Sequence, residues 1–235
     1  MKRLITGLTL LLAMVAMAQA SVTVAFDPGI TYETPALTGF STYGDMMDGM
    51  LVTVYFLPPS SGGYYTILEQ TQWVDTTPGN GGAFGTYWSL IEEGDTYTGT
   101  WTLTSGYNLI GVLIRGSFGN TIFDQTSPSP GTPGSESGRT FEFLGSSVVY
   151  PLDIVATYRN LVALTGFAPV GDEYEQLELS FTNYGGFLGS LTFRSDTDSA
   201  ATGQHVTPRV PAPGAMLLGV IGTGLVGWLK RRGSV

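Results

Sequence analysis

The sequence predicts an all-β fold, a β-sandwich or jelly-roll-like domain, in residues 21–199. Three observations support this prediction. Short segments rich in β-branched and aromatic residues recur along the chain, as is typical of strands. Several of these segments alternate apolar with polar residues, which is the period of a half-buried strand. Glycine clusters separate them at residues 62–63, 79–82 and 185–186, and short strands with such turn signals are typical of sandwiches.

The expected strands differ in the type of sequence pattern that predicts them. Residues 97–103 place threonines on one face and Tyr97, Trp101 and Leu103 on the other, whereas residues 109–114 are continuously apolar, as in a strand buried on both faces. Residues 154–164 fit either a strand or a short helix, and we favour strand. Further strands are expected at residues 51–56, 64–68, 72–74, 122–123, 140–143, 177–181 and 191–194. Prolines and glycines at 127–138 predict a surface loop.

The first 20 residues have the organisation of a signal peptide. Lys2 and Arg3 precede an apolar stretch at residues 4–17, and small residues follow at Ala18 and Ala20. Small residues at these two positions direct cleavage after Ala20. The alternative is a retained N-terminal anchor, which the shortness of the apolar stretch disfavours.

The end of the chain combines a Pro-rich stalk at residues 200–213 with a transmembrane sorting helix and basic stop at residues 214–232. The apolar run at 215–229 is slightly short for a bilayer, and flanking basic side chains compensate for such a mismatch. The alternative is a buried helix of a soluble protein, which the charges that follow disfavour. The basic stop consists of Lys230, Arg231 and Arg232.

This tail resembles the PEP-CTERM sorting signal of Gram-negative bacteria. Val210, Pro211, Ala212 and Pro213 occupy the position of the short motif, with Ala212 where the family usually has glutamate. The resemblance implies transient membrane insertion, an exosortase-type membrane protease as partner, and delivery through the inner membrane to the cell surface or outside. It also implies a role within exopolysaccharide. The stretches at 94–103, 121–124 and 191–198 are similar to sandwich domains that often precede such tails.

The composition excludes several classes of function. The sequence has no cysteine, so thiolate metal sites and thiol nucleophiles are excluded. Between the two ends, 19 carboxylates face five arginines, a formal charge of 5 minus 19, or −14, which disfavours nucleic-acid binding. The single histidine, His205, lies in the stalk, so a catalytic triad is not expected. We therefore expect no enzyme, and a glycosidase is the least favoured alternative.

Carboxylates give the one candidate metal site. Asp196 and Asp198, two residues apart, offer oxygens to Ca²⁺, and no other cofactor is expected. The alternative is a turn with side-chain-to-backbone bonds. Residues 92–95 are expected to form an acidic turn, and the acids at 172–178 are expected to lie in a solvated loop that runs into a strand.

The aromatic residues raise an alternative function, a carbohydrate-binding module. Trp88, beside glycine-rich sequence, is the candidate for an exposed ring that stacks on a sugar. The favoured interpretation is that the tryptophans fill the core, above all Trp101 on its alternating strand. The preferred function is therefore an exported structural or adhesive protein of the cell surface or extracellular matrix.

Overall fold

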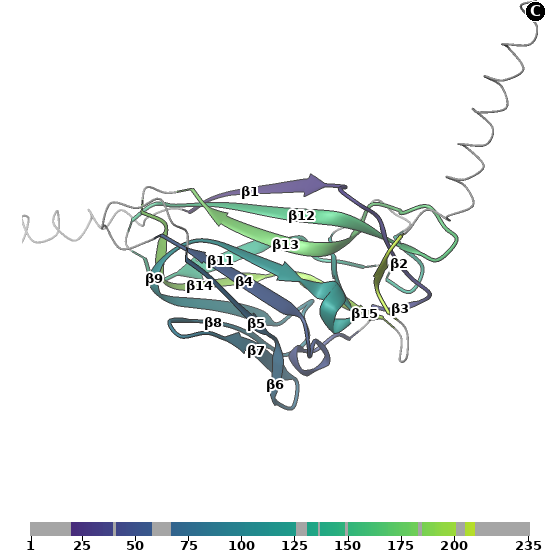
Figure 1. Ribbon diagram of the computed structural model, residues 1–235, viewed down its shortest axis with the longest axis horizontal. Helices are drawn as coiled ribbons and strands as arrows, with labels where there is room; N and C mark the ends of the chain where they lie inside the picture. Colours follow the sequence, from purple (N-terminus) through teal and green to yellow (C-terminus); the bar gives the residue numbers. More distant parts are fainter. Residues whose placement is uncertain are drawn as a thin grey trace, which may run out of the picture.

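The computed structural model describes residues 20–39, 41–57, 67–125, 131–135, 137–148, 150–182, 185–200 and 205–209. This part of the chain forms strands and two short 3₁₀ helices, η1 (Gly44–Met46) and η2 (Gly116–Gly119), with no α-helix (Figure 1). The prediction of an all-β fold is confirmed. The strands are β1 (Ala20–Asp27), β2 (Tyr32–Thr34), β3 (Leu37–Thr38), β4 (Leu51–Phe56), β5 (Ile67–Gln72), β6 (Val74–Thr77), β7 (Asn80–Phe84), β8 (Trp88–Glu93), β9 (Thr100–Arg115), β10 (Thr121–Asp124), β11 (Glu142–Ser146), β12 (Leu152–Leu164), β13 (Glu173–Phe181), β14 (Phe187–Arg194), β15 (Asp196–Ala200) and β16 (Thr207–Pro208).

The strands form two sandwich-like layers that share the long strand β9 (Figure 1). The first half of β9 pairs with β8 on one side and with β14 on the other. This half belongs to a layer with the strand order β6-β7-β8-β9-β14-β11. The second half pairs with β4 and β13, in a layer of order β5-β4-β9-β13-β12-β1. Most of these pairings are antiparallel, and β1 pairs with β12 in parallel. One strand therefore connects the two layers covalently.

Aromatic side chains fill the space between the layers. Trp101 is fully buried and stacks on Phe193, with ring centroids 5.8 Å apart. Its Nε1 donates a hydrogen bond to the Ser195 carbonyl at 2.9 Å, so the indole's polar atom is satisfied. Trp73 and Tyr158 are fully buried in the same cluster. The prediction that Trp101 belongs to the core is confirmed.

Short strands extend the sheet at one end of the molecule. β10 lies between the start of β13 and β15, and β15 also pairs with β3. The end of β12 pairs with β2, which in turn pairs with β16. A second, smaller apolar cluster of Leu37, Ile122, Val162 and Val206 packs here. This end carries the candidate site described below.

Most of the expected strands exist, with changes at their limits. Residues 51–56 form β4 and residues 154–164 lie in β12, as predicted. The two expected strands at 97–103 and 109–114 are one strand, β9, which begins only at Thr100 because Gly99 N donates to the Asp95 carbonyl in a turn. The expected strand at 72–74 is interrupted at Trp73, whose amide donates to the Met50 carbonyl at 2.7 Å while the ring enters the core.

The expected terminal signals lie mostly outside the described residues. Ala18, the sorting motif at 210–213 and the basic stop at 230–232 belong to this part, whereas Ala20 is the first residue of β1. In the described segments, no helix is long and apolar enough to cross a membrane. Residues 205–209 of the expected stalk pack on the domain, since Val206 is buried and Arg209 Nε lies 2.5 Å from Glu33 Oε1.

Candidate metal centre

Five carboxylates converge inside the end of the molecule where β10 runs between β13 and β15. They are Asp124, Asp172, Glu173, Asp196 and Asp198, and we call them the acidic cluster. Each of them is at most 2% exposed. Residues from three separate parts of the chain therefore place their acids in one buried region.

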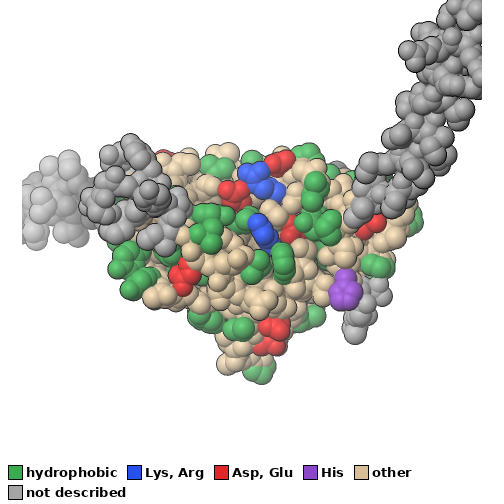
Figure 2. Space-filling model, in the orientation of Figure 1, with side chains coloured by type: hydrophobic (Ala, Val, Ile, Leu, Met, Phe, Trp, Pro, Cys, Tyr) green, Lys and Arg blue, Asp and Glu red, His purple; other side chains and the backbone are tan. Residues whose placement is uncertain are grey.

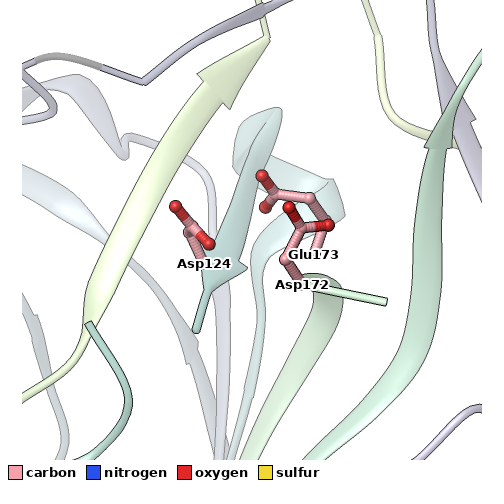
Figure 3. Close-up of side chains that lie close together, drawn as sticks. All are labelled: Asp124, Asp172 and Glu173. Carbon is pink, nitrogen blue, oxygen red and sulfur yellow. The ribbon is translucent and has the colours of Figure 1, made fainter. Parts of the chain in front are cut away.

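The strand register brings these acids together. Asp124, the last residue of β10, lies directly opposite Glu173 on β13 and opposite Asp196 on β15. Asp196 and Asp198 lie two residues apart on β15, and alternate residues of a strand share one face. Figure 3 shows the side chains of Asp124, Asp172 and Glu173 close together, with Asp124 reaching in from another segment. Like charges directly opposite one another destabilise a sheet, so this arrangement needs compensation.

Hydroxyl and amide donors hold part of the acidic cluster in place. Thr132 donates to Asp172 twice, from its amide at 2.6 Å and from its hydroxyl at 2.7 Å. The Ser135 hydroxyl donates to Asp124 Oδ2 at 2.9 Å. On the other side, Asp196 Oδ1 accepts hydrogen bonds from the Thr96 hydroxyl and the Thr197 amide, each at 2.9 Å. These donors are neutral, so they orient the carboxylates but do not cancel their charge.

Other oxygens of the acidic cluster have no hydrogen-bond partner. They are both carboxylate oxygens of Glu173, Asp124 Oδ1 and Asp196 Oδ2. The Ser135 hydroxyl lies near Glu173 too, but its one proton is directed to Asp124 Oδ2. Leaving a buried charged group without partners costs several kcal/mol, which folded proteins avoid by protonation or by binding a cation.

The pKa values of the acidic cluster also indicate that its carboxyls are protonated or need a cation. Burial, followed by the charge of Asp198, raises the pKa of Asp124 to about 9. Burial raises the pKa of Asp196 to about 7, although its hydrogen bonds from Thr96 and Thr197 oppose the shift. Burial and the charge of Asp124 raise the pKa of Glu173 well above its usual value. Without a cation, Asp124 and Glu173 therefore retain protons at neutral pH, and Asp196 is partly protonated.

The neighbouring arginine does not neutralise the acidic cluster. Arg139 lowers the pKa of Asp196 slightly, as the last of several causes. Its guanidinium is engaged elsewhere, 3.4 Å from Glu142 Oε2 and 4.8 Å from the centre of the Tyr97 ring. On the face drawn in Figure 2, acidic side chains are scattered in small groups, some beside arginines. The concentrated negative charge lies inside the protein.

The donor set suits a hard divalent cation. The acidic cluster comprises two groups of three acids, and within each group one oxygen from every acid lies within 4.8 Å of the others. Ca²⁺ binds oxygen ligands at 2.3–2.6 Å, so oxygens on opposite sides of the ion are about 4.6–5.2 Å apart. Zinc prefers histidine and cysteine, which these groups do not contain. The partnerless oxygens of Glu173, Asp124 and Asp196 fit the ligands of a calcium ion.

Sequence reasoning identified two of the five acids. Asp196 and Asp198 occur in the acidic cluster, on a strand and not in the alternative turn. Asp124, Asp172 and Glu173 were missed, because only the pairing of β10 with β13 and β15 brings them near. The expectation of a solvated loop at 172–178 is wrong, since Asp172, Glu173 and Glu175 are fully buried.

The acidic turn expected at residues 92–95 is correct only for its second half. Gly94 has a positive φ of 97°, as a turn glycine does, and Asp95 also lies in the turn. Glu92, in contrast, is the fully buried fifth residue of β8. Its partnerless oxygens lie outside both groups of the acidic cluster.

Trp88 does not present its ring to solvent. It is only 4% exposed and packs against the backbone of Gly85. Its Nε1 donates to Glu69 Oε2 at 3.0 Å. The burial of Trp88 agrees with the favoured interpretation that the tryptophans fill the core, and the alternative of an exposed Trp88 ring is not supported.

An aromatic groove lies beside Trp88. The rings of Tyr87 and Tyr107 are 54% and 44% exposed, with centroids 4.4 Å apart and planes inclined by 54°. Together with Phe56, Leu68 and Glu69 they line a groove of about 400 Å³. We call it the tyrosine groove. The exposed aromatic side chains of this region are therefore Tyr87 and Tyr107, and not Trp88, which the sequence offered as the candidate under the alternative function.

The single histidine lies away from the acidic cluster. His205 is exposed, and its Nδ1 is 3.2 Å from Asn120 Oδ1.

Comparisons with protein-family models, curated proteins and solved structures give no match to this chain. The fold and the site together define an all-β domain with a buried cluster of five carboxylates.

Proposed function

We propose that the chain is an exported cell-surface or extracellular-matrix protein whose β domain is a non-catalytic structural or adhesive module completed by Ca²⁺. The observation that carries the calcium part is the acidic cluster, in which Glu173 keeps both oxygens without a partner at 0% exposure. A buried carboxylate of this kind needs a counter-charge. A divalent cation supplies it with the oxygen ligands already assembled.

Calcium binding fits an exported destination. Extracellular modules bind Ca²⁺ with dissociation constants of about 10⁻⁴–10⁻³ M, and more carboxylates raise the affinity. A domain with such an affinity binds Ca²⁺ only where the ion is abundant. Burial of the acidic cluster also supports a structural role and not a catalytic one, because a sugar chain has no access to carboxylates that are at most 2% exposed.

Thermal unfolding of the full chain in mild detergent, with EDTA or with Ca²⁺, tests the calcium part. At a Ca²⁺ concentration of about 100 times the dissociation constant, binding stabilises a protein by about 2.7 kcal/mol. For a domain of this size that corresponds to a rise in Tm of about 5–11 °C. Mg²⁺ at the same concentration is the matched control and should give a smaller rise, because Mg²⁺ sheds its waters reluctantly. Equal Tm values in EDTA and Ca²⁺ would refute the calcium part.

Delivery by an exosortase-type system is the second part of the proposal, and the resemblance of the tail to PEP-CTERM signals supports it. The secreted form should then lack the residues after about Pro213, which its intact mass reveals. A tail that stays attached would contradict processing. Pro211→Ala, and separately removal of Lys230, Arg231 and Arg232, should trap or mislocalise the protein, as cell fractionation reports. Normal surface delivery of both variants would contradict a sorting role.

The tyrosine groove favours a second function, binding of carbohydrate within exopolysaccharide. Exposed aromatic faces suit the apolar faces of sugar rings, and a volume of about 400 Å³ is within the range of small-ligand sites. The inclined pair of Tyr87 and Tyr107 offers two adjacent faces, and their phenol groups add hydrogen-bonding atoms.

Pull-down on exopolysaccharide from the producing cells tests this second function. Tyr87→Ala and Tyr107→Ala should each weaken the binding about tenfold or more, which corresponds to a loss of about 1.4 kcal/mol or more. Phe118→Ala is the matched control, because Phe118 is an aromatic residue that is 57% exposed and outside the groove. Equal binding by all three variants would remove the groove as the site.

A further inference from the structure

The five acids of the acidic cluster are divided into two groups that share one residue. Asp124, Asp172 and Glu173 form the first group, and Asp124, Asp196 and Asp198 form the second. Within each group the oxygens are close enough to surround a single calcium ion. The division follows from topology, because β10 is the middle strand and its last residue faces an acid on each side.

Each group contains its own evidence for a ligand. In the first group, both oxygens of Glu173 are buried without a hydrogen-bond partner. In the second group, Asp196 Oδ2 is also buried without a hydrogen-bond partner, whereas Asp196 Oδ1 accepts two hydrogen bonds. The shared residue, Asp124, directs Oδ2 to Ser135 and leaves Oδ1 without a partner. A single ion in one group would leave the partnerless oxygens of the other group uncompensated.

The charge of the acidic cluster also matches two ions better than one. Five ionised carboxylates carry a formal charge of −5. One divalent cation would leave −3 in a buried volume, whereas two leave −1, which agrees with the rule that buried charges are paired or coordinate metals.

The backbone closes over both groups. Thr132 fixes Asp172 of the first group through two hydrogen bonds. A Cβ placed on Gly39 would lie 2.8 Å from Asp198 Oδ2 of the second group, and a Cβ on Gly138 would collide with the Asp124 carboxylate. The main chain at these two glycines therefore packs directly on the carboxylates and shields them from water.

We propose that the acidic cluster holds two Ca²⁺ ions bridged by the carboxylate of Asp124. The proposal rests on the calcium binding proposed above and specifies its stoichiometry and its central ligand. One ion lies between Asp124, Asp172 and Glu173, and the other between Asp124, Asp196 and Asp198. Loss of the bridging ligand affects both ions, whereas loss of a ligand of one group affects one.

Counting bound calcium tests this arrangement. Native mass spectrometry and titration calorimetry of the full chain in mild detergent, with Ca²⁺ alone as probe, should give two ions per chain. Glu173→Gln and Asp198→Asn should each retain one ion. Asp124→Asn should weaken both ions by more than the roughly 10–100-fold that loss of an outer partner causes. Glu92→Gln is the matched control, a buried partnerless carboxylate outside both groups, and should retain two ions.

The possible outcomes separate this inference from the calcium proposal itself. One ion per wild-type chain at saturation, lost in both single-group variants, would overturn the two-ion arrangement and leave calcium binding intact. Two ions that both survive Asp124→Asn would overturn the bridge. No bound calcium would overturn both. The substitutions are neutral and nearly isosteric, and they relieve like-charge repulsion, so near-ultraviolet circular dichroism should show that each variant folds.

Discussion

Replacing the buried carboxyl of Glu92 by an amide should stabilise the protein. Glu92 is fully buried on β8, and its oxygens have no hydrogen-bond partner. Burial, followed by the charge of Asp95, raises its pKa to about 9. Its Oε1 lies over Gly99, where the carbonyl oxygens of Glu93 and Asp95 also converge. An amide has nearly the shape of a carboxyl and does not ionise, so Glu92→Gln preserves the packing of this site without its titration.

The magnitude follows from proton linkage. The folded chain keeps the Glu92 proton up to about pH 9, whereas the unfolded chain loses it near pH 4.5. The unfolded state therefore binds fewer protons between these values, and wild-type stability falls by about 1.4 kcal/mol per pH unit. Glutamine does not titrate, so the variant escapes this loss. At pH 7 it should be more stable by about 3 kcal/mol, and near pH 4 the difference should vanish.

Urea unfolding at pH 4, 5.5, 7 and 8.5 measures this difference, with EDTA in every sample so that the acidic cluster contributes equally to both proteins. A gain of about 3 kcal/mol corresponds to a rise in Tm of about 6–12 °C. Glu93→Gln is the matched control, since the neighbouring Glu93 is exposed and should shift stability by less than about 0.5 kcal/mol. Parallel curves for Glu92→Gln and wild type across this range would refute the reasoning.

Three further predictions concern the acidic cluster, the core and the surface. In EDTA, Asp124 with its pKa of about 9 should make the free energy of unfolding fall between about pH 4 and 9, by roughly 1.4 kcal/mol per pH unit for this group. Saturating Ca²⁺ should remove this fall. Equal slopes against pH in urea unfolding with and without Ca²⁺ would contradict the prediction. Trp101→Phe leaves the buried Ser195 carbonyl without its donor and should lower the free energy of unfolding by about 2–3 kcal/mol; an unchanged urea midpoint would contradict this. Arg159→Ala removes two partly exposed ion pairs, with Glu178 at 2.6 Å and with Asp27 at 2.5 Å, and should cost less than about 2 kcal/mol, decreasing with added salt. A larger loss in the same assay would show that the pairs are not screened.

Local patterns were sufficient to predict the fold class but not the limits of its strands. The alternation predicted a strand with Tyr97, Trp101 and Leu103 on its buried face. Trp101 and Leu103 lie on β9 and are fully buried, whereas Tyr97 precedes the strand and is 40% exposed. The pattern did not reveal that the chain continues as one strand to Arg115, because residues 104–108 are polar or small and are typical of a turn. Strand pairing on both sides of β9 overrides that local preference.

The acidic cluster was only partly predictable for a related reason. Asp196 and Asp198 are close in sequence, so their shared face follows from the strand period alone. Asp124 and Glu173 meet them through pairings between distant strands, and a single sequence contains no local sign of such pairings. The glycine-rich neighbourhood made Trp88 the candidate for an exposed ring, whereas Gly85 in fact makes room for the indole, in agreement with the favoured core interpretation.

Pairings between strands from the beginning and the end of the described chain have a consequence for the timing of folding. β1 needs β12, β2 needs β16, and the hydroxyl of Thr38 donates to the carbonyl of Ser199, 161 residues later. Contacts between such distant residues form slowly, because a long loop must close first. The sheet therefore reaches its final form only after nearly all of these residues have emerged together.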